Sequence, residues 1–287
     1  MNLTGTIESA EKQFKQILED FFISVFNEKF LSSHGIDHHR RVWNYSKEML
    51  KLIPLKNSVQ ISRLASELII ASYLHDIGMS VDPGVRHGKH SRDLCSQFLV
   101  KNNLPQNDWQ DVLEAIENHD NKDYAGNTSI NELLAILSVA DDLDAFGLIG
   151  IFRYSEIYLT RGIDPEKIGH LIRENAEKRF GNFIKTFGSD SEIVQKHKKR
   201  YNILDDFFSK YNEQLPFYRF GSTNPSGFCG VIEIIHFMMN NGLQLKNFFT
   251  EQEKYSKDPV ILWYLSELAS ELLVEHTVVY PLRGMNI

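Results

Sequence analysis

Apolar residues recur at intervals of three and four along most of the chain. Between Ser9 and Phe26 they occupy positions 14, 17, 18, 21, 22 and 25, a spacing typical of an amphipathic helix with one buried face. The same spacing predicts further helices over residues 38–53, 58–77, 88–102, 107–119, 129–147, 165–187, 192–212, 229–241 and 258–276. The two-residue alternation of a half-buried strand is hard to find anywhere. The pattern therefore predicts an all-α fold.

Four short stretches rich in glycine, proline, asparagine or aspartate interrupt this pattern. They lie at Asn102–Asn107, Asn121–Asn127, Gly162–Pro165 and Phe220–Gly230. There is no internal repeat and no long Gly/Ser linker, so we expect the C-terminal half to pack on the first half rather than to form a tethered module. We place the division near residue 160, which separates residues 1–160 from residues 161–287.

The composition is that of a globular protein and argues against several kinds of partner. Of the 287 residues, 42% are hydrophobic and 24% are charged, which allows a sizeable core. The net charge of -7 at pH 7 provides no positive field for long nucleic acid or for an anionic membrane. No apolar run reaches membrane-spanning length and the N-terminal residues do not resemble a signal peptide, so we expect a cytoplasmic protein. The two isolated cysteines, Cys95 and Cys229, agree with a reducing compartment.

Histidines are concentrated in one part of the chain. Seven of the eleven lie between residues 34 and 119, at positions 34, 38, 39, 75, 87, 90 and 119. Acidic residues stand close to several of them, namely Asp37, Asp76, Glu117 and Asp120, and a further acidic run follows at Asp141, Asp142 and Asp144. Because imidazole and carboxylate groups are common ligands of divalent metals, this clustering indicates a metal site.

The adjacent pair His75-Asp76 follows an apolar helical segment that begins near Leu64. A carboxylate buried beside an imidazole is costly unless a cation neutralises it, and a divalent ion does so while using both residues as ligands. Taken alone, the pair has a simpler interpretation, a capping or ion-paired dyad at a helix end. The segments before and after it favour the metal.

Those segments are HGIDHHRRVW at residues 34–43 and SVADDLDAFGLIG at residues 138–150. The order H-x-x-R-V, then His-Asp, then a later helical Asp resembles the HD superfamily of metal-dependent phosphohydrolases, whose shared core is a helical bundle that holds the metal between helices. The resemblance covers roughly residues 30–155. It implies an HD-type bundle with additional C-terminal helices, in which residues 1–160 comprise an N-terminal helix and the metal-binding core.

The resemblance also implies the ligands. They are His38, His75, Asp76 and Asp141. Such a set suits manganese, iron, cobalt, nickel or zinc better than calcium, and holds magnesium weakly. One ion is expected from these four residues.

A second ion is left open. Some members of the superfamily hold two metals, and His87 and His119 stand in the intervals where their additional histidines occur, with Asp76 able to bridge ions about 3.5–4 Å apart. His90 is an alternative to His87. Against a second ion, this chain has His119-Asp120 where relatives with cyclic-dinucleotide activity carry two adjacent histidines, and it lacks their Gly-Tyr-Pro signature.

Substrate contacts are predicted on both sides of the His-Asp pair. His34 matches the first histidine of the H-x-x-x-H opening of bacterial relatives and is a candidate at the pocket rim, with a solvent-exposed loop histidine as the alternative. Five basic residues of the region could meet a phosphate, namely Arg41, Arg86, Lys89, Arg92 and Arg153. We rank Arg86 and Lys89 first because they flank His87 in an expected loop. Solvated loop charges are the competing interpretation.

Asp141 and Asp144 are three residues apart and share a helix face, whereas Asp142 is rotated away. Asp144 is expected to accept a hydrogen bond from a ligating histidine or from Arg41, with a surface ion pair as the alternative. In the implied mechanism the ion lowers the pKa of a bound water and the resulting hydroxide attacks phosphorus. Asp76 or Asp144 is the candidate to receive the proton, and we group Arg41 with them as catalytic.

The sequence therefore predicts a phosphomonoesterase or phosphodiesterase that acts on a nucleotide or another small phosphate ester. Two alternatives remain. One is a di-iron oxygenase of the same superfamily, which requires both metal sites. The other is a non-catalytic regulatory or binding module stabilised by a metal. The expected partner is a small phosphorylated substrate, not a membrane or long nucleic acid, and a homodimer is compatible with the sequence.

Overall fold

The structure is a computed structural model that describes residues 3–26, 31–52, 57–121, 132–243 and 256–274, together with Phe249. Within these ranges every regular element is helical, which confirms the all-α prediction. The α-helices are α1 (Leu3–Phe26), α2 (Ile36–Leu50), α3 (Ser58–Leu74), α4 (His87–Lys101), α5 (Gln110–Asn118), α6 (Glu132–Asp144), α7 (Gly147–Thr160), α8 (Pro165–Phe187), α9 (Glu192–Gln214), α10 (Gly227–Asn240) and α12 (Pro259–Val274). Short 3-10 helices are η1 (Ser32–His34), η2 (Ile77–Ser80), η3 (Gln106–Trp109) and η4 (Leu215–Phe217).

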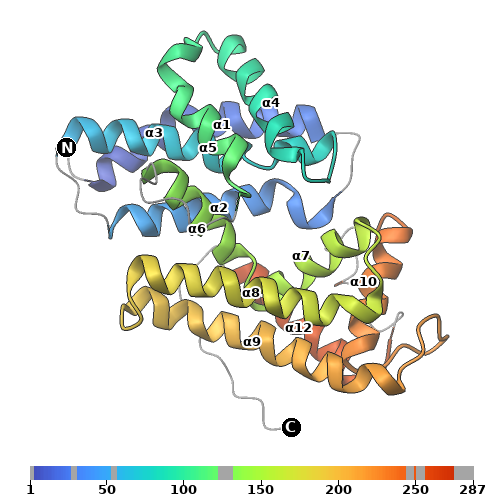
Figure 1. The fold of residues 1–287 in the computed structure, drawn as a ribbon. Coiled ribbons are helices and arrows are strands. Elements are labelled where there is room, and N and C mark those ends of the chain that lie inside the picture. The colour runs from blue at the N-terminus through green and yellow to red at the C-terminus, as the bar shows by residue number, and fades with distance from the viewer. Residues whose placement is uncertain are drawn as a thin grey trace.

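The helices form two packed groups (Figure 1). In the first, α1 and α2 pack on α3, α2 also packs on α6, and α4 packs on α5. In the second, α8 lies along α9, and α7 contacts α9, α10 and α12. The groups meet where α8 packs on α6 and α7 packs on η1. The predicted division near residue 160 stays a prediction, and α7, which precedes it, packs mainly on helices that follow it.

One apolar core runs through both groups. Its largest buried side chains include Trp43 and Phe98 in the first group and Phe183, Phe207 and Tyr264 in the second. Burial of this surface is the main force that holds the helices together. Among the described residues, no helix combines the length and apolarity needed to cross a bilayer.

Local capping explains where several helices begin. The Asn57 side chain accepts a hydrogen bond from the Gln60 backbone N–H at the start of α3. Asp164 does the same for Glu166 at the start of α8, where Pro165 occupies the first helical position. Such caps satisfy backbone donors that lack a partner within the helix.

The predicted helix over residues 129–147 is wrong at its C-terminal end. Helix α6 ends at Asp144, and a separate helix, α7, which no predicted segment covers, begins at Gly147. Gly147 has φ +76°, a conformation that favours glycine, and a Cβ there would lie 2.4 Å from Oε1 of Glu271. Glu271 instead accepts hydrogen bonds from the Leu148 and Ile149 backbone N–H groups, so a residue on α12 caps α7.

Other differences are smaller. Helix α1 begins at Leu3 rather than near Ser9, since Ile7 and Ala10 continue its buried face. The segment predicted over 58–77 ends its α-helix at Leu74 and continues as η2. The breaks predicted near residues 102–107 and 162–165 are present, whereas the break over residues 122–127 lies outside the described residues.

Helix α9 contacts α2 through a buried histidine whose charge state should make stability depend on pH. The His197 ring is completely buried between Tyr45 and Phe183. Its Nε2 lies 3.8 Å from a Glu48 carboxylate oxygen, too far for a hydrogen bond. Burial lowers the pKa of His197 to about 4, whereas an exposed histidine in the unfolded chain titrates near 6.5.

As pH falls from about 6.5 toward 4, the unfolded chain therefore takes up a proton at His197 that the folded protein does not. We expect the free energy of unfolding to fall with it, by about 2 kcal/mol between pH 7 and pH 5 from this residue alone. Urea denaturation of the wild type and of His197→Gln at both pH values would measure the effect. The stability difference between the two proteins should shrink at pH 5, and an unchanged difference would contradict the prediction.

Candidate metal centre

Helices α2, α3 and α6 bring together the four residues predicted as ligands. His38 lies on α2, His75 and Asp76 follow the last turn of α3, and Asp141 lies on α6. The Nε2 atoms of His38 and His75 are 3.2 Å apart, and they lie 3.5 and 3.4 Å from Oδ2 of Asp76. Both are 3.7 Å from Oδ1 of Asp141. All four side chains are buried, and one ligand atom from each lies within 4.8 Å of the others.

A second group uses the other oxygen of the same carboxylate. Oδ1 of Asp76 lies 3.0 Å from Nε2 of His119 and 3.4 Å from Nε2 of His87. The two Nε2 atoms are 3.4 Å apart, and both rings are buried. His87 begins α4 and His119 follows the end of α5. Asp76 therefore presents one oxygen to each group, as a carboxylate bridging two ions does.

Hydrogen bonds at the far side of each ring indicate where the lone pairs point. The backbone oxygens of Ser72, Gly84 and Ile116 accept from Nδ1 of His75, His87 and His119 at 3.0, 2.8 and 2.7 Å. A carbonyl oxygen only accepts, so each of these Nδ1 atoms carries the proton. Nδ1 of His38 lies 2.7 Å from a carboxylate oxygen of Asp144, which holds that ring in the same tautomer.

A neutral ring in this tautomer would direct its Nε2 lone pair at the neighbouring Nε2 atom or at Asp76. Such an arrangement is repulsive unless a positive charge lies between the groups, and nitrogen and carboxylate donors at these separations suit a divalent transition metal. The residues present therefore fit a metal. They are compatible with one ion in the first group and a second in the group of Asp76, His87 and His119.

The pKa values of His75 and Asp76 also indicate that positive charge stabilises this site. Burial by itself would lower the pKa of His75, but the carboxylates of Asp76 and Asp141 outweigh it and raise the pKa to about 10. Burial would raise the pKa of Asp76, yet His75, His119 and His38 hold it well below the ordinary value. These carboxylates therefore favour a proton on His75, and a divalent ion between them supplies twice that charge.

Asp144 does not lie in the pocket, which corrects its prediction as a proton acceptor. Its carboxylate is completely buried and accepts hydrogen bonds from Arg41 Nε and Nη2 at 2.7 and 2.9 Å. Arg153 Nη1 lies 3.2 Å away, and His38 is on its other side. These contacts keep the pKa of Asp144 far below the usual range despite burial. Asp144 therefore contacts both His38 and Arg41, and neither Asp144 nor Arg41 is among the residues that line the pocket.

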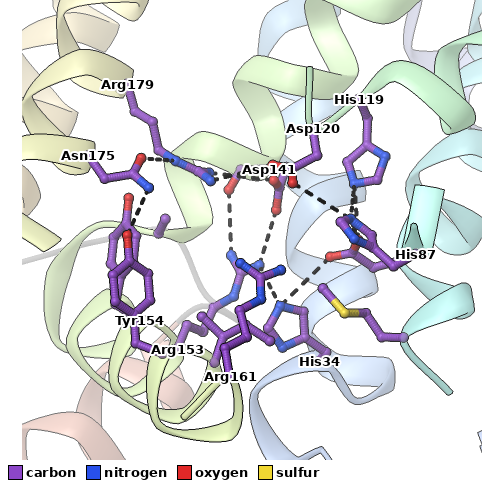
Figure 2. A pocket seen from close by; sticks show the side chains of 15 residues that line it. His34, His87, His119, Asp120, Asp141, Arg153, Tyr154, Arg161, Asn175 and Arg179 are labelled. Atoms are coloured by element: carbon purple, nitrogen blue, oxygen red, sulfur yellow. Dashed lines mark hydrogen bonds and ion pairs between the residues drawn. The ribbon is translucent and has the colours of Figure 1, made fainter. Parts of the chain in front are cut away.

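A pocket opens beside the ligand groups and is lined by both groups of helices (Figure 2). The ligand side contributes His34, Asp76, His87, His119, Asp120 and Asp141. The opposite side carries Arg153, Tyr154, Tyr158 and Arg161 from α7 and its end, and Asn175 and Arg179 from α8. The pocket, together with the solvent space at its mouth, measures about 510 Å³.

The arginines are the site residues that sequence reasoning ranked too low or missed. Arg153 donates to Asp141 Oδ1 at 3.1 Å, and its Nη2 lies 3.4 Å from Nε2 of His38. Arg179 donates to Asp142 at 2.6 Å and lies 3.6 Å from Asp141. Asp142, which belongs to neither ligand group, is also wholly buried. Arg179 belongs to a helix outside the motif region, and no signal in its own sequence context sets it apart.

Arg86 and Lys89 are not brought into the pocket. The Arg86 side chain is 75% exposed and lies 3.7 Å from Asp82, and Lys89 is exposed on α4. Because α4 turns only His87 toward Asp76, its neighbours in sequence point away. The prediction that they face a phosphate is therefore corrected.

His34 does line the pocket, as the sequence suggested. It is buried at the end of η1, where Nδ1 meets the Ser33 hydroxyl at 2.7 Å and Nε2 lies 3.8 Å from Asp76 Oδ2. Burial, together with the neighbouring Arg153, lowers its pKa well below the ordinary value, so the ring is neutral. His39 faces away from the ligands, with Nδ1 donating to the Ser72 carbonyl oxygen at 3.2 Å.

Glycines allow the close backbone approaches that position the second group. A Cβ on Gly78 would lie 2.2 Å from the His87 carbonyl oxygen, and one on Gly88 would lie 2.5 Å from the Glu117 carbonyl oxygen. The Gly78 N–H also donates to the Ser91 hydroxyl at 2.8 Å. Any larger residue would push α4, and His87 with it, away from Asp76.

Comparison with protein-family models matches residues 35–145 to the HD domain. The matched region begins just before His38 and ends just after Asp144, so it contains both ligand groups and excludes α7 and α8. Comparisons with curated proteins and with solved structures find no significant match for the chain.

Proposed function

Residues 35–145 of this chain form an HD domain, and from that premise we propose that the protein is a metal-dependent phosphohydrolase of small phosphate esters, including nucleotides. The observation that carries the proposal is the carboxylate of Asp76, whose two oxygens face two sets of converging imidazole lone pairs. Its location at the floor of a pocket with three arginines favours an anionic substrate.

Divalent ions at such a site acidify water to yield a nucleophile near neutral pH and act as Lewis acids toward phosphoryl oxygens. His38, His75, Asp76 and Asp141 would hold the first ion, and His87 and His119 would hold a second that shares Asp76. The hydrogen bonds at Nδ1 of each histidine fix the rings before any ion binds. This orientation lowers the cost of assembling the site.

Arg153 supplies the positive charge nearest to the ligands. Its guanidinium is buried and held by Asp141 and Asp144, and Nη2 lies 3.4 Å from His34 Nε2. A group fixed in this way can stabilise charge that develops on phosphoryl oxygens without reorganising. Since the chain carries a net charge of -7, local arginines rather than a general field must attract the phosphate.

Asp120 is the carboxylate best placed to accept a proton from the attacking water. It lines the pocket, its side chain is 42% exposed, and Oδ2 lies 4.0 Å from Nε2 of His87. Asp76 faces both ligand groups and Asp144 is buried behind them, which leaves Asp120 as the accessible group on the ligand side.

The proposal is tested by elemental analysis of the purified protein together with phosphate release from phosphomonoesters, nucleotides and cyclic nucleotides. We expect bound transition metal and release of phosphate that depends on it. Absence of metal under every loading condition would sink the proposal. Bound metal without phosphate release from any compound would support the metal centre but contradict the proposed hydrolase activity.

The second ligand group leads to a prediction about stoichiometry. His119→Ala should reduce manganese binding from two ions to one per chain, because it removes one of only two imidazoles in that group. Equilibrium dialysis followed by elemental analysis measures the change. His90→Ala, whose ring is not among the ligand groups, is the control and should leave two ions bound. Two ions in both variants would mean that His119 is not a ligand.

Arg153→Met should lower kcat/KM for phosphate release by about 100-fold, the usual effect of removing one fixed donor to transition-state charge. Since Arg153 also pairs with Asp141, metal content is measured in parallel and is expected to stay unchanged. Arg153→Lys keeps the positive charge but cannot form bidentate hydrogen bonds, so it should recover only part of the lost kcat/KM. Equal activity of the Met variant and the wild type would contradict this role.

The second group of ligands also favours one other chemistry. A di-iron oxygenase of the same superfamily needs two adjacent metal sites, and the shared Asp76 is compatible with them. The two functions separate experimentally, because an oxygenase would contain iron and consume oxygen with its substrate. Metal-dependent phosphate release under anaerobic conditions would exclude it.

A further inference from the structure

One face of α7 forms a continuous wall of the pocket. Its lining residues are Arg153, Tyr154, Ile157, Tyr158 and Arg161, spaced as neighbours on successive helical turns. Arg153 lies next to Asp141 (Figure 2), and its Nη2 is also 3.4 Å from Nε2 of His38. Arg161 directly follows Thr160, the last residue of the helix. Eight residues of helix rise by about 12 Å, so the backbones of the two arginines lie about that far apart along the axis of α7.

The arginines differ in how their charge is balanced. Arg153 lies 3.1 and 3.2 Å from oxygens of Asp141 and Asp144, and Arg179 donates to Asp142. Arg161 is exposed at the pocket mouth, and its Nε donates to the backbone carbonyl oxygen of Pro83 at 3.2 Å. Within the described part of the chain, no carboxylate forms an ion pair with it. The contact with Pro83 holds the Arg161 guanidinium in place, and its remaining N–H donors are available to an anion.

The segment between the two arginines contains a buried polar group with no partner. Tyr154 is 4% exposed, and its hydroxyl oxygen has no hydrogen-bond partner among the described residues. The Arg179 guanidinium lies 5.7 Å from the centre of its ring. Tyr158, packed edge to face against Tyr154, accepts a hydrogen bond from Asn175 at 3.1 Å. A buried hydroxyl left unpaired is costly, so a pocket that holds one is suited to a ligand that pairs with it.

We propose that Arg161 binds a second anionic group of the substrate, and that the tyrosines of α7 contact the organic spacer that joins it to the scissile phosphate. The inference rests on the proposed hydrolase function. It names a substrate class: phosphate esters in which a ring the size of a sugar or an arene separates two anionic groups. All of these recognition residues lie beyond the matched HD region, so the C-terminal helices determine the substrate.

Two matched pairs of compounds test the proposal and separate the sources of the second anion. Adenosine 5′-monophosphate is compared with adenosine 3′,5′-bisphosphate, and phenyl phosphate with 4-carboxyphenyl phosphate. The wild type, Arg161→Gln and the control Arg86→Gln are assayed for kcat/KM, each with manganese bound. Arg86 is a matched control because it is an exposed arginine near the same loop but outside the pocket.

We expect the wild type and Arg86→Gln to prefer the member with two anions by about tenfold or more, and Arg161→Gln to lose that preference. Preference for the bisphosphate alone would assign the subsite to phosphate, and preference in both pairs would assign it to anions in general. No preference in the wild type, or equal losses in the two variants, would overturn the proposal.

Calorimetric titration of the same proteins with both adenosine nucleotides keeps this inference distinct from the proposed function. If no compound releases phosphate but the bisphosphate binds more tightly than the monophosphate only when Arg161 is present, the hydrolase proposal fails and the anion subsite stands. If neither turnover nor binding depends on Arg161, the subsite is wrong even where phosphate release confirms a hydrolase.

Discussion

Asp76→Asn is expected to lower kcat/KM for phosphate release on the order of 10³-fold or more, with loss of bound metal. The physical reason is the use of both carboxylate oxygens, one toward His38 and His75 and the other toward His87 and His119. An amide keeps the size of the side chain but replaces one oxygen with an NH₂ group, which cannot coordinate. Either orientation of the amide therefore disables one ligand group.

The matched control is Asp37→Asn, one position before His38 on the same helix. Asp37 is 66% exposed and pairs with Arg40 at the surface, so this variant should keep metal and activity. Thermal unfolding of both variants distinguishes loss of ligation from loss of fold. Full activity in Asp76→Asn would refute the metal centre. A folded, metal-free and inactive variant would instead count against a purely structural role for the metal.

Asp144→Ala is expected to lower the free energy of unfolding by about 3–5 kcal/mol, the usual cost of breaking a buried ion pair from one side. Its carboxylate is completely buried and compensates two guanidinium groups, those of Arg41 and Arg153. Removing it leaves both buried charges without that partner. It also frees the His38 ring, so metal affinity should fall about 10- to 100-fold.

Asp205→Ala provides a control, because it removes the same kind of ion pair at a more solvent-exposed position. Asp205 accepts from Arg173 at 2.7 and 3.2 Å, but the two side chains are 29% and 39% exposed. Its replacement should cost only about 0–1 kcal/mol, as for other exposed pairs. Urea denaturation of the two variants and the wild type gives the comparison. Similar losses in the free energy of unfolding for the two variants would show that burial of Asp144 does not have the expected effect.

Helical periodicity was sufficient for the fold class, because an amphipathic helix has to place apolar residues on one side whatever it packs against. It was less reliable at helix ends. The apolar pattern continues through residues 129–147, yet α6 ends at Asp144 and a new helix begins at Gly147. The reason is a contact with Glu271, more than a hundred positions away, which no local pattern contains.

The motif residues could be selected before the structure because their spacing along the chain is itself the signal. The structure brings His38, His75, Asp76 and Asp141 within ligand distance of one another, and places His87 and His119 at the other oxygen of Asp76. Ranking Arg86 and Lys89 by their closeness to His87 was wrong, since adjacent residues on a helix point in different directions.

The sequence by itself determined that this protein is helical and contains the HD motif, because apolar spacing and ligand order are local properties of a chain. Only the tertiary structure decided which charges meet the ligands. Arg153, Arg161 and Arg179 reach the pocket because α7 and α8 pack against the HD region, and Asp144 is buried because Arg41 and Arg153 enclose it. Some of these contacts join residues more than a hundred positions apart. They depend on how helices pack and not on the pattern within any one of them.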